Sequence, residues 1–326
     1  MTSLTRRTEL MDSSALASAS GAAGVWLKLE CDQVTGSFKA RGAASAIGQQ
    51  LGAATAKGVA TASTGNHAKG VLRAFSRLVD PTSGTAVEVF VPSSITPAKL
   101  SALTSLGAKV RVQESDDCEK AEAAARAWAA GSGAVFVSPY NDMLVIGGQG
   151  TVGLEIAEQA PEPLDVVLVP VGGGGLISGI AAAIKAKMPG VLVVGCQPAS
   201  NCCMRDSLGA GRILAEGEFE NGATLSDGTA GGIEAGSVTF QACGELVDGW
   251  LVASEPEILD AMALLLRTHG KVVEGAAATT VACVTAPRNR AMFEGKRVGL
   301  VLCGGNVSPQ TAVEVAQRAK ELAGAA

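Results

Sequence analysis

The chain has 326 residues, of which 47% are hydrophobic, 17% are charged and only 3% are aromatic. This composition is typical of a folded globular protein and not of a disordered one, and the length suggests two domains or one large α/β domain. The formal net charge is −5, from 26 Lys and Arg against 31 Asp and Glu, and no basic run with interleaved aromatic residues occurs, so we expect no nucleic-acid partner.

Short apolar runs alternate with alanine-rich stretches along the chain. The runs that we predict as strands are Val25–Leu29, Gly58–Ala62, Ala86–Val91, Lys109–Val112, Val135–Val137, Val166–Val171, Val191–Cys196 and Val298–Leu302. The intervening stretches that we predict as helices include Ala68–Val79, Pro97–Leu106, Cys118–Ala130, Gly147–Ala160, Ile177–Lys187 and Glu255–Thr268. Strands separated by helices indicate βαβ units with right-handed crossovers and parallel sheets. We expect two groups of such units, with irregular structure over Arg205–Ser237.

The first segment that carries candidate chemistry is Thr35–Gly42, with the sequence TGSFKARG. It follows a predicted strand and opens a helix, so that Gly36 would allow a tight turn and Ser37 would cap the helix. Lys39 then lies in the first helical turn, where the positive end of the helix dipole disfavours the ammonium and favours a nucleophilic amine. A solvated lysine without chemistry is an equally good interpretation of this segment alone.

A second strand-to-helix turn contains Ser63, Thr64, Gly65, Asn66 and His67. Backbone N–H groups at a helix N-terminus bind carboxylate or phosphate, and an asparagine can offer its amide to a phenolic or carbonyl oxygen. An ordinary helix start would have the same pattern. We interpret the imidazole of His67 as structural, because a lone histidine is more often a core residue than a ligand.

The third segment is an apolar strand that runs into four glycines and then a helix. The glycines are Gly172, Gly173, Gly174 and Gly175. Residues without Cβ let backbone amides surround an anion at close range. A dinucleotide site is not expected, because the spacing is not G-x-G-x-x-G and no acidic residue follows about 20 positions later. The loop therefore suits one phosphate group better than a pyrophosphate with a ribose.

The fourth segment is a predicted strand that leads into Cys303, Gly304, Gly305 and Asn306. In open α/β sheets ligands bind outside the carboxyl ends of the strands, so we place Cys303 where contacts to a cofactor would come from. We interpret the other cysteines as inert thiols. Because no CxxC pair occurs in this long chain, we expect reduced thiols in a cytoplasmic compartment. No stretch of about 18 uninterrupted apolar residues occurs, so we expect no membrane span.

Taken together, these four segments resemble the fold-type II pyridoxal-phosphate enzymes, the group of serine and threonine dehydratases and serine racemase. The resemblance runs in order along nearly the whole chain and includes Leu27–Glu30 (LKLE) and Gly147–Thr151 (GGQGT). It implies an α/β fold of the tryptophan synthase β type, with two parallel-sheet αβα domains. Residues 1–52 and 141–326 would form the large cofactor-binding domain, and residues 53–140 a small mobile domain.

The resemblance assigns contacts to the cofactor. It implies that Lys39 forms a Schiff base with pyridoxal 5'-phosphate and that Phe38 packs beside the pyridine ring. Asn66 would donate a hydrogen bond to the 3-oxygen of the ring, and Gly172–Gly175 would bind the phosphate. Cys303 would face the pyridine nitrogen. A thiol, with a reference pKa of about 8.5, is a weak partner there and stabilises a carbanion less than an aspartate would, which favours elimination over transamination.

The resemblance also implies a substrate and a reaction. The loop residues that would receive the substrate carboxylate, largely through backbone amides, are Ser63, Thr64, Asn66 and His67. The freed amine of Lys39 would take the Cα proton as general base, and the β-hydroxyl would leave. The products would be a 2-oxo acid and ammonia. We therefore predict an ammonia-lyase that acts on a small hydroxy amino acid such as L-serine, L-threonine or threo-3-hydroxyaspartate.

Thr64 keeps other activities open. In the family's racemases a serine at this position is the second acid/base group, whereas threonine dehydratases usually have alanine. Because Thr64 retains a hydroxyl, a serine or aspartate-like racemase with side dehydratase activity is the second hypothesis. A β-replacement synthase is third, since the loop has Gly-Asn-His rather than Gly-Asn-Thr. A non-catalytic α/β ligand-binding protein would share the parallel sheets and glycine loops.

Further expectations concern metal, assembly and location. The stretch that matches the family's divalent-metal site, Gln197–Cys203, lacks the carboxylates that Mg²⁺ and Ca²⁺ prefer, so we predict weak metal dependence or none. The chain ends soon after Asn306, so we expect no C-terminal regulatory domain and no feedback by isoleucine. The family pattern implies a homodimer, and Arg126 is a further candidate for a residue near the active site.

Overall fold

The computed structural model describes residues 4–324, which form two compact units. Unit 1 comprises residues 4–6 and Phe38–Gln149, and unit 2 comprises Arg7–Ser37 and residues 150–324. Residues 38–52 and 141–149, which were assigned from sequence to the large domain, cluster with residues 53–140. The mobility of the small domain stays a prediction.

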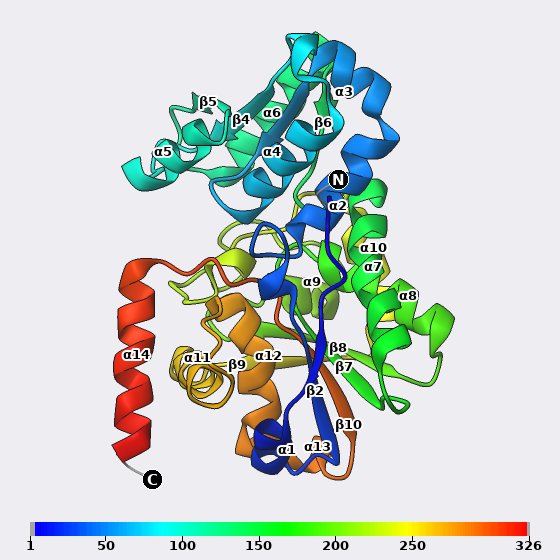
Figure 1. Cartoon of the computed structure of the whole chain (residues 1–326), viewed down its shortest axis with the longest axis vertical. Coiled ribbons are helices and arrows are strands. Elements are labelled where there is room, and N and C mark those ends of the chain that lie inside the picture. The colour runs from blue at the N-terminus through cyan, green and yellow to red at the C-terminus, as the bar shows by residue number, and fades with distance from the viewer. Residues whose placement is uncertain (1–3, 325–326) are drawn as a thin grey trace. The chain divides into compact units, whose positions relative to one another are not determined.

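Unit 1 is built on a parallel sheet with the strand order β5-β4-β3-β6 (Figure 1). The strands are β3 (Val59–Ala62), β4 (Val87–Val91), β5 (Lys109–Val112) and β6 (Val135–Phe136). The helices are α2 (Lys39–Gln49), α3 (Leu51–Lys57), α4 (Asn66–Leu78), α5 (Pro97–Ser105) and α6 (Cys118–Ser132), and α7 (Met143–Gln159) begins in this unit. β3 is buried along its whole length, because side chains of α2 and α4 pack on one face of the sheet and those of α6 on the other.

Unit 2 contains a second sheet, with the strand order β1-β2-β10-β7-β8-β9. The strands are β1 (Leu10–Asp12), β2 (Gly24–Lys28), β7 (Val166–Pro170), β8 (Leu192–Pro198), β9 (Gly249–Ala253) and β10 (Arg297–Val301). The helices are α1 (Ser14–Ser20), α8 (Gly175–Lys187), α9 (Cys203–Ala210), α10 (Val238–Leu246), α11 (Glu255–His269), α12 (Gly275–Thr285), α13 (Arg290–Phe293) and α14 (Pro309–Gly324). β1 runs antiparallel to β2, and the other pairs are parallel.

The predicted α/β architecture with parallel sheets is confirmed, and each predicted strand and helix overlaps an observed one. The structure adds β1, which has only three residues, and β9, a short apolar run (GWLVA) that was not predicted as a strand. It also adds α12, which is buried on every side from Gly275 to Val284 and so lacks an amphipathic pattern. The prediction of irregular structure over Arg205–Ser237 was partly wrong, because α9 extends to Ala210 and a short 3₁₀ helix covers Asp227–Thr229.

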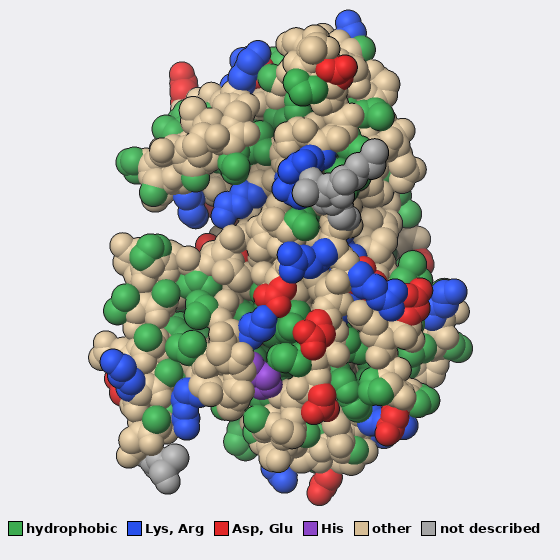
Figure 2. All heavy atoms as spheres, viewed as in Figure 1, with side chains coloured by type: hydrophobic (Ala, Val, Ile, Leu, Met, Phe, Trp, Pro, Cys, Tyr) green, Lys and Arg blue, Asp and Glu red, His purple; other side chains and the backbone are tan. Residues whose placement is uncertain are grey.

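The visible surface of unit 2 carries both signs of charge. In Figure 2, blue Lys and Arg side chains and red Asp and Glu side chains are interspersed on this face rather than gathered by sign. On this side the unit therefore offers no extended basic surface of the kind that binds nucleic acid. Within residues 4–324, no helix combines the length and the apolar character needed to cross a bilayer.

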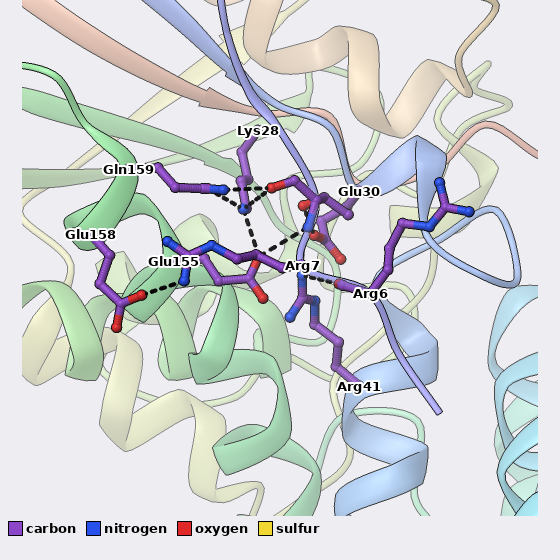
Figure 3. Close-up of polar contacts among 9 residues, drawn as sticks. Arg6, Arg7, Lys28, Glu30, Arg41, Glu155, Glu158 and Gln159 are labelled. Carbon is purple, nitrogen blue, oxygen red and sulfur yellow. Dashed lines mark hydrogen bonds and ion pairs between the residues drawn. The ribbon is translucent and has the colours of Figure 1, made fainter. Parts of the chain in front are cut away.

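A buried ionic cluster in unit 2 joins the N-terminal segment, β2 and the second half of α7 (Figure 3). The side chain of Lys28 is 0% exposed, and its Nζ donates to Glu155 Oε2 at 2.6 Å and to Gln159 Oε1 at 2.7 Å. The same Nζ donates to the Thr8 carbonyl at 2.8 Å, while the Thr8 hydroxyl donates to the buried carboxyl of Glu30. The ammonium can be buried because these acceptors replace the water that it loses.

Removing the carboxyl group of Glu155 should therefore destabilise unit 2. We expect Glu155→Ala to lower the free energy of unfolding by about 3–5 kcal/mol, because the Lys28 ammonium stays buried without its ion-pair partner. Unfolding by urea, followed by tryptophan fluorescence, measures this change.

The matched control is the neighbouring ion pair between Arg7 and Glu158, whose side chains are 53% and 60% exposed. Glu158→Ala should cost less than about 1 kcal/mol, because water and salt screen an exposed pair. If Glu155→Ala and Glu158→Ala lowered the free energy of unfolding by the same amount, the buried ion pair would contribute no more stability than the exposed one, which contradicts this prediction.

Candidate functional site

The turn that leads to Lys39 contains a glycine in the left-handed region. Gly36 has a φ of 73°, and its N–H donates to the Gln33 carbonyl at 2.7 Å. Lys39 is the first residue of α2, so its predicted place in the first helical turn is confirmed. The predicted cap is wrong, because the N-cap is Phe38 and the buried Ser37 Oγ has no hydrogen-bond partner among residues 4–324.

Within unit 2, the turn Thr35–Ser37, here called the lysine turn, lies against Cys303–Asn306, here called the β10 turn. The contacts that join them are the Ser37–Gly304 backbone bridge, the Gly305 N–H to Gly36 carbonyl bond at 2.9 Å and the Asn306 Nδ2 to Thr35 carbonyl bond at 2.9 Å. The first and fourth segments singled out in the sequence are therefore neighbours. Ser37 takes part in this bridge through its backbone and lies one residue before the N-cap of α2.

The amine of Lys39 has a defined acceptor within unit 1. Its Nζ donates to the Pro139 carbonyl at 2.7 Å and lies 5.1 Å from the centroid of the Phe38 ring. A Cβ on Gly70 would lie 3.0 Å from the Lys39 carbonyl oxygen, so this glycine lets α4 pack closely against α2. The lysine is therefore held at both its backbone and its amine.

The second segment forms the predicted strand-to-helix turn, between β3 and α4. Gly65 is the N-cap of α4, which begins at Asn66 and has no side-chain capping bond. The Ser63 hydroxyl accepts a hydrogen bond from the Gly65 N–H at 3.1 Å, and both Ser63 and Thr64 are partly exposed. Because no side chain caps this helix, its N-terminal amides are suited to a small anion such as a carboxylate.

The imidazole of His67 is buried and neutral. Burial, and next the charge of Lys39, lower the pKa of His67 to about 3. Its Nε2 lies 3.0 Å from the Val137 carbonyl, which also accepts a hydrogen bond from the Thr61 hydroxyl at 2.8 Å. A carbonyl only accepts, so Nε2 carries the proton, and the buried Nδ1 has no partner among the described residues. This geometry supports the structural interpretation of the side chain.

The glycine loop, Gly172–Gly175, joins β7 to α8 in the predicted place. Gly174 is the N-cap of α8, with a φ of 86° and no capping side chain. A Cβ on Gly172 would lie 2.9 Å from the Thr229 Cα, and a Cβ on Gly174 would lie 2.8 Å from the Met204 Cε. Both positions therefore exclude larger residues, which leaves backbone N–H groups as the donors that the loop can offer.

Side chains from neighbouring elements hold this loop. The Thr239 hydroxyl donates to the Gly173 carbonyl at 2.7 Å, and the Gln197 Nε2 donates to the Val171 carbonyl at 3.3 Å. With these carbonyls engaged, the loop presents backbone amides at the N-terminus of a 13-residue helix. A phosphate group is the ligand that such a donor set fits best.

Cys303 follows β10 and is 5% exposed, at the carboxyl end of the strand as predicted. The cysteines of the chain all lie in its described part and none forms a disulfide. Burial raises the pKa of both Cys31 and Cys243 to about 12, so these two thiols stay protonated at neutral pH. They match the expectation of inert thiols.

The stretch after β8 is held by amide hydrogen bonds. The Gln197 Oε1 accepts the Arg205 N–H at 3.1 Å, so the Gln197 side chain connects α9 to the strand before the glycine loop. Burial raises the pKa of Cys202 to about 11. In the described range, 4–324, no set of three or more His, Cys, Asp or Glu side chains is arranged to hold a metal ion. The degree of metal dependence stays a prediction.

Two residues near the site carried no signal in the sequence. Pro139 acts through its backbone carbonyl, which any residue could supply. Glu274 lies directly before α12, and its hydrogen bonds with Gly304 and Asn306 of the β10 turn depend on the tertiary fold. Arg126 pairs with Glu122 at 3.5 Å and lies over the Phe136 ring, and its approach to a substrate is still untested.

Residues 1–304 match the family model described as pyridoxal-phosphate dependent enzyme. The chain is 42% identical to an L-threonine ammonia-lyase from Thermotoga maritima, over 92% of this chain and 71% of that protein. It resembles the processed form of threonine deaminase isoform 2 from Solanum lycopersicum, with a TM-score of 0.86 and 28% identity over 97% of this chain and 89% of that one. A serine racemase from Dictyostelium discoideum gives a TM-score of 0.82 and 31% identity, over 93% and 94% of the two chains.

A side chain at Gly174 should disturb phosphate binding. We expect Gly174→Ala to weaken the affinity for pyridoxal phosphate about tenfold, because alanine is strained at a φ of 86° and its Cβ would meet Met204 and Thr239. Titration of the purified protein with pyridoxal phosphate measures the affinity. Gly190→Ala is the control, since that position has open space around it and should bind as the unaltered chain does. An unchanged affinity in Gly174→Ala would refute the expectation that the glycine loop binds the phosphate.

Proposed function

Because the chain belongs to the pyridoxal-phosphate dependent enzyme family, we propose that it is an ammonia-lyase that dehydrates and deaminates a small β-hydroxy amino acid. L-Threonine and L-serine are the first substrates to consider, and threo-3-hydroxyaspartate is a third. The observation that carries the proposal is the identity of 42% and 39%, over 92% and 98% of this chain, to two proteins named L-threonine ammonia-lyase. A lysine at the predicted turn supplies the amine that this chemistry requires.

The residues present fit the cofactor of the family. Lys39 would hold pyridoxal phosphate covalently, with Phe38 beside the ring, and Gly172–Gly175 would bind the phosphate through backbone amides. Asn66 would donate to the 3-oxygen of the ring, and the thiol of Cys303 would face the ring nitrogen. When bound, the cofactor withdraws electrons from the substrate Cα and makes its proton acidic.

The chain's own groups would then move the protons. The amine of Lys39 acts as the general base that takes the Cα proton, and the Pro139 carbonyl gives this amine a fixed acceptor that limits its orientation. The turn Ser63–His67 binds the substrate carboxylate at the N-terminus of α4, which places the Cα within reach. The β-hydroxyl would take up one proton and leave as water, which balances the Cα proton given to the Lys39 amine. The released enamine would then add water and give a 2-oxo acid and ammonia.

The weak partner at the ring nitrogen directs the reaction. A thiol such as that of Cys303 is a poor hydrogen-bond donor compared with a protonated carboxyl or an ammonium group. Negative charge at the Cα is then less stabilised, so loss of a β-leaving group competes well with reprotonation. This preference supports elimination.

Racemisation is the second candidate function, and Thr64 is the observation that favours it. Its side chain lies in the turn that would bind the substrate and keeps a hydroxyl that could protonate the opposite face of the Cα. Solved serine and aspartate racemases share the fold, with TM-scores of 0.82 at 31% and 30% identity. A lyase with a slower racemase activity is consistent with both sets of relatives.

The proposal extends to metal and assembly. Gln197 makes both of its amide contacts within the protein, and we infer that the stretch after β8 needs no divalent cation to hold its shape. A homodimer in the cytoplasm, with a small amino acid as its ligand, completes the proposed description.

A substrate panel tests the function directly. The chain, loaded with pyridoxal phosphate, is assayed with L-serine, L-threonine and both threo- and erythro-3-hydroxyaspartate for release of ammonia, and with L-serine also for D-serine. We expect ammonia from at least one of them, and pyruvate from L-serine faster than D-serine. Lys39→Ala should lower the rate by about 100-fold or more, because the general base is lost.

Lys57 provides the control, since it is an exposed lysine of α3 in the same unit. Lys57→Ala should keep the full rate. D-Serine formed faster than pyruvate would make racemisation the main activity. Full turnover by Lys39→Ala, or no ammonia from any of the four amino acids, would refute the proposed function.

A further inference from the structure

The carboxyl group of Glu274 reaches the β10 turn. The residue is 7% exposed and lies immediately before α12. Its Oε1 accepts the Asn306 N–H at 2.8 Å, and its own N–H donates to the Gly304 carbonyl at 3.0 Å. A Cβ on Gly304 would lie 2.5 Å from the same Oε1, so only a glycine lets the carboxyl pack this closely. Glu274 therefore holds the β10 turn on both sides of Gly305.

The side chain of Glu274 does not cap its own helix. Glu274 is the N-cap of α12, a position where the shorter side chains of Ser, Thr, Asp and Asn normally accept hydrogen bonds from the first helical amides, and it makes no capping bond. Its carboxyl is turned instead toward a backbone amide in the β10 turn, more than thirty residues along the chain. A buried carboxyl needs hydrogen-bond donors, and the Asn306 N–H is one that Glu274 uses, so this bond fixes the β10 turn against the start of α12.

The β10 turn also holds the lysine turn. The backbone N–H of Asn306 donates to the Glu274 carboxyl, and the side-chain Nδ2 of the same residue donates to the Thr35 carbonyl at 2.9 Å. Gly305 donates to the Gly36 carbonyl, and Gly304 bridges the backbone of Ser37. A continuous set of hydrogen bonds within unit 2 thus runs from the Glu274 carboxyl to the residues that lead directly into Phe38 and Lys39.

We propose that Glu274 is a positioning residue for Lys39, which acts by fixing the β10 turn and, through it, the lysine turn. The proposal rests on the function proposed above for Lys39. Glu274 does this as a hydrogen-bond acceptor, so an uncharged side chain of the same shape can replace it. The same contacts set the backbone next to Cys303, the residue proposed to face the ring nitrogen.

Two substitutions separate the hydrogen bond from the charge. Glu274→Gln keeps an oxygen that can accept the Asn306 N–H, whereas Glu274→Ala removes it. In the protein without cofactor, hydrogen–deuterium exchange should be faster for a peptide that spans Asn306 in Glu274→Ala and close to the unaltered rate in Glu274→Gln. This readout does not depend on enzymatic activity.

The kinetic test uses the protein loaded with pyridoxal phosphate. We expect Glu274→Ala to lower kcat about 10- to 100-fold, because a displaced amine transfers the Cα proton less well. KM should change much less, because the turn proposed to bind the substrate carboxylate, Ser63–His67, is not part of the hydrogen-bond set that runs from Glu274 to the lysine turn. Glu274→Gln should recover most of the rate.

Asp165 provides a matched control at the opposite end of β10. Its Oδ2 accepts the Arg297 N–H at 2.7 Å, so it holds the start of the strand as Glu274 holds the turn after it. Asp165→Ala should speed exchange near Arg297 while leaving exchange at Asn306 and kcat unchanged. An equal loss of kcat in Asp165→Ala would mean that any loosening of β10 is enough, and would overturn the specific role.

A second variant covers a failure of Glu274→Ala to fold. Asn306→Ala keeps the backbone N–H that Glu274 accepts and removes the bond to the Thr35 carbonyl, so we expect slow exchange at position 306 together with a lowered kcat. The proposal is overturned if Glu274→Ala has the same exchange rate at Asn306 or the same kcat as the unaltered chain. It is also overturned if the kcat of Glu274→Gln is as low as that of Glu274→Ala.

The two proposals fail separately. If the unaltered chain releases no ammonia, the proposed lyase function is refuted. Exchange at Asn306 and the yield of pyridoxal phosphate fixed to Lys39 by borohydride then still decide the role of Glu274, with reduced fixation in Glu274→Ala expected and equal fixation contradicting it.

Discussion

Backbone contacts between two turns of unit 2 set the path of the chain into Lys39. In the lysine turn, the Gly36 carbonyl accepts the Gly305 N–H and the Thr35 carbonyl accepts the Asn306 side-chain amide, both from the β10 turn. Since β10 lies inside a six-stranded sheet between β2 and β7, the β10 turn is anchored by the core. The lysine turn is therefore fixed by the centre of the sheet, and the proposed chemistry of Lys39 depends on that constraint.

The carboxyl end of the same sheet also carries the glycine loop. β7 is the neighbour of β10 and ends at the glycine loop, where Gly172 and Gly174 exclude side chains and leave backbone amides as donors. Parallel strands present their carboxyl ends together, so the adjacent strands β10 and β7 bring the Cys303 thiol, the β10 turn and the glycine loop proposed to bind phosphate to one edge of the sheet. Unit 1 repeats the arrangement with β3 and the turn before α4, which suits a carboxylate.

Much of this arrangement could be predicted from the sequence, because a glycine-rich segment after an apolar run predicts a turn at the carboxyl end of a buried strand. The βαβ pattern, the place of Lys39 in the first turn of α2 and the glycine loop between β7 and α8 all follow from local sequence. The contacts that orient the lysine do not. The Pro139 carbonyl has no residue-type signal, and the donor to the Glu274 carboxyl is a backbone N–H far along the chain. Ser37 looks like an N-cap, but its backbone forms a bridge with Gly304 and the helix starts later.

The attachment of the cofactor to Lys39 is the claim that one measurement tests most directly. The purified chain is incubated with pyridoxal phosphate, reduced with borohydride and digested, and the modified lysine is located by mass spectrometry. We expect the reduced cofactor on the peptide that contains Lys39, in a ratio of about one per chain, and a loss of that label in Lys39→Ala. Attachment to a different lysine, or no attachment at all, would contradict the account.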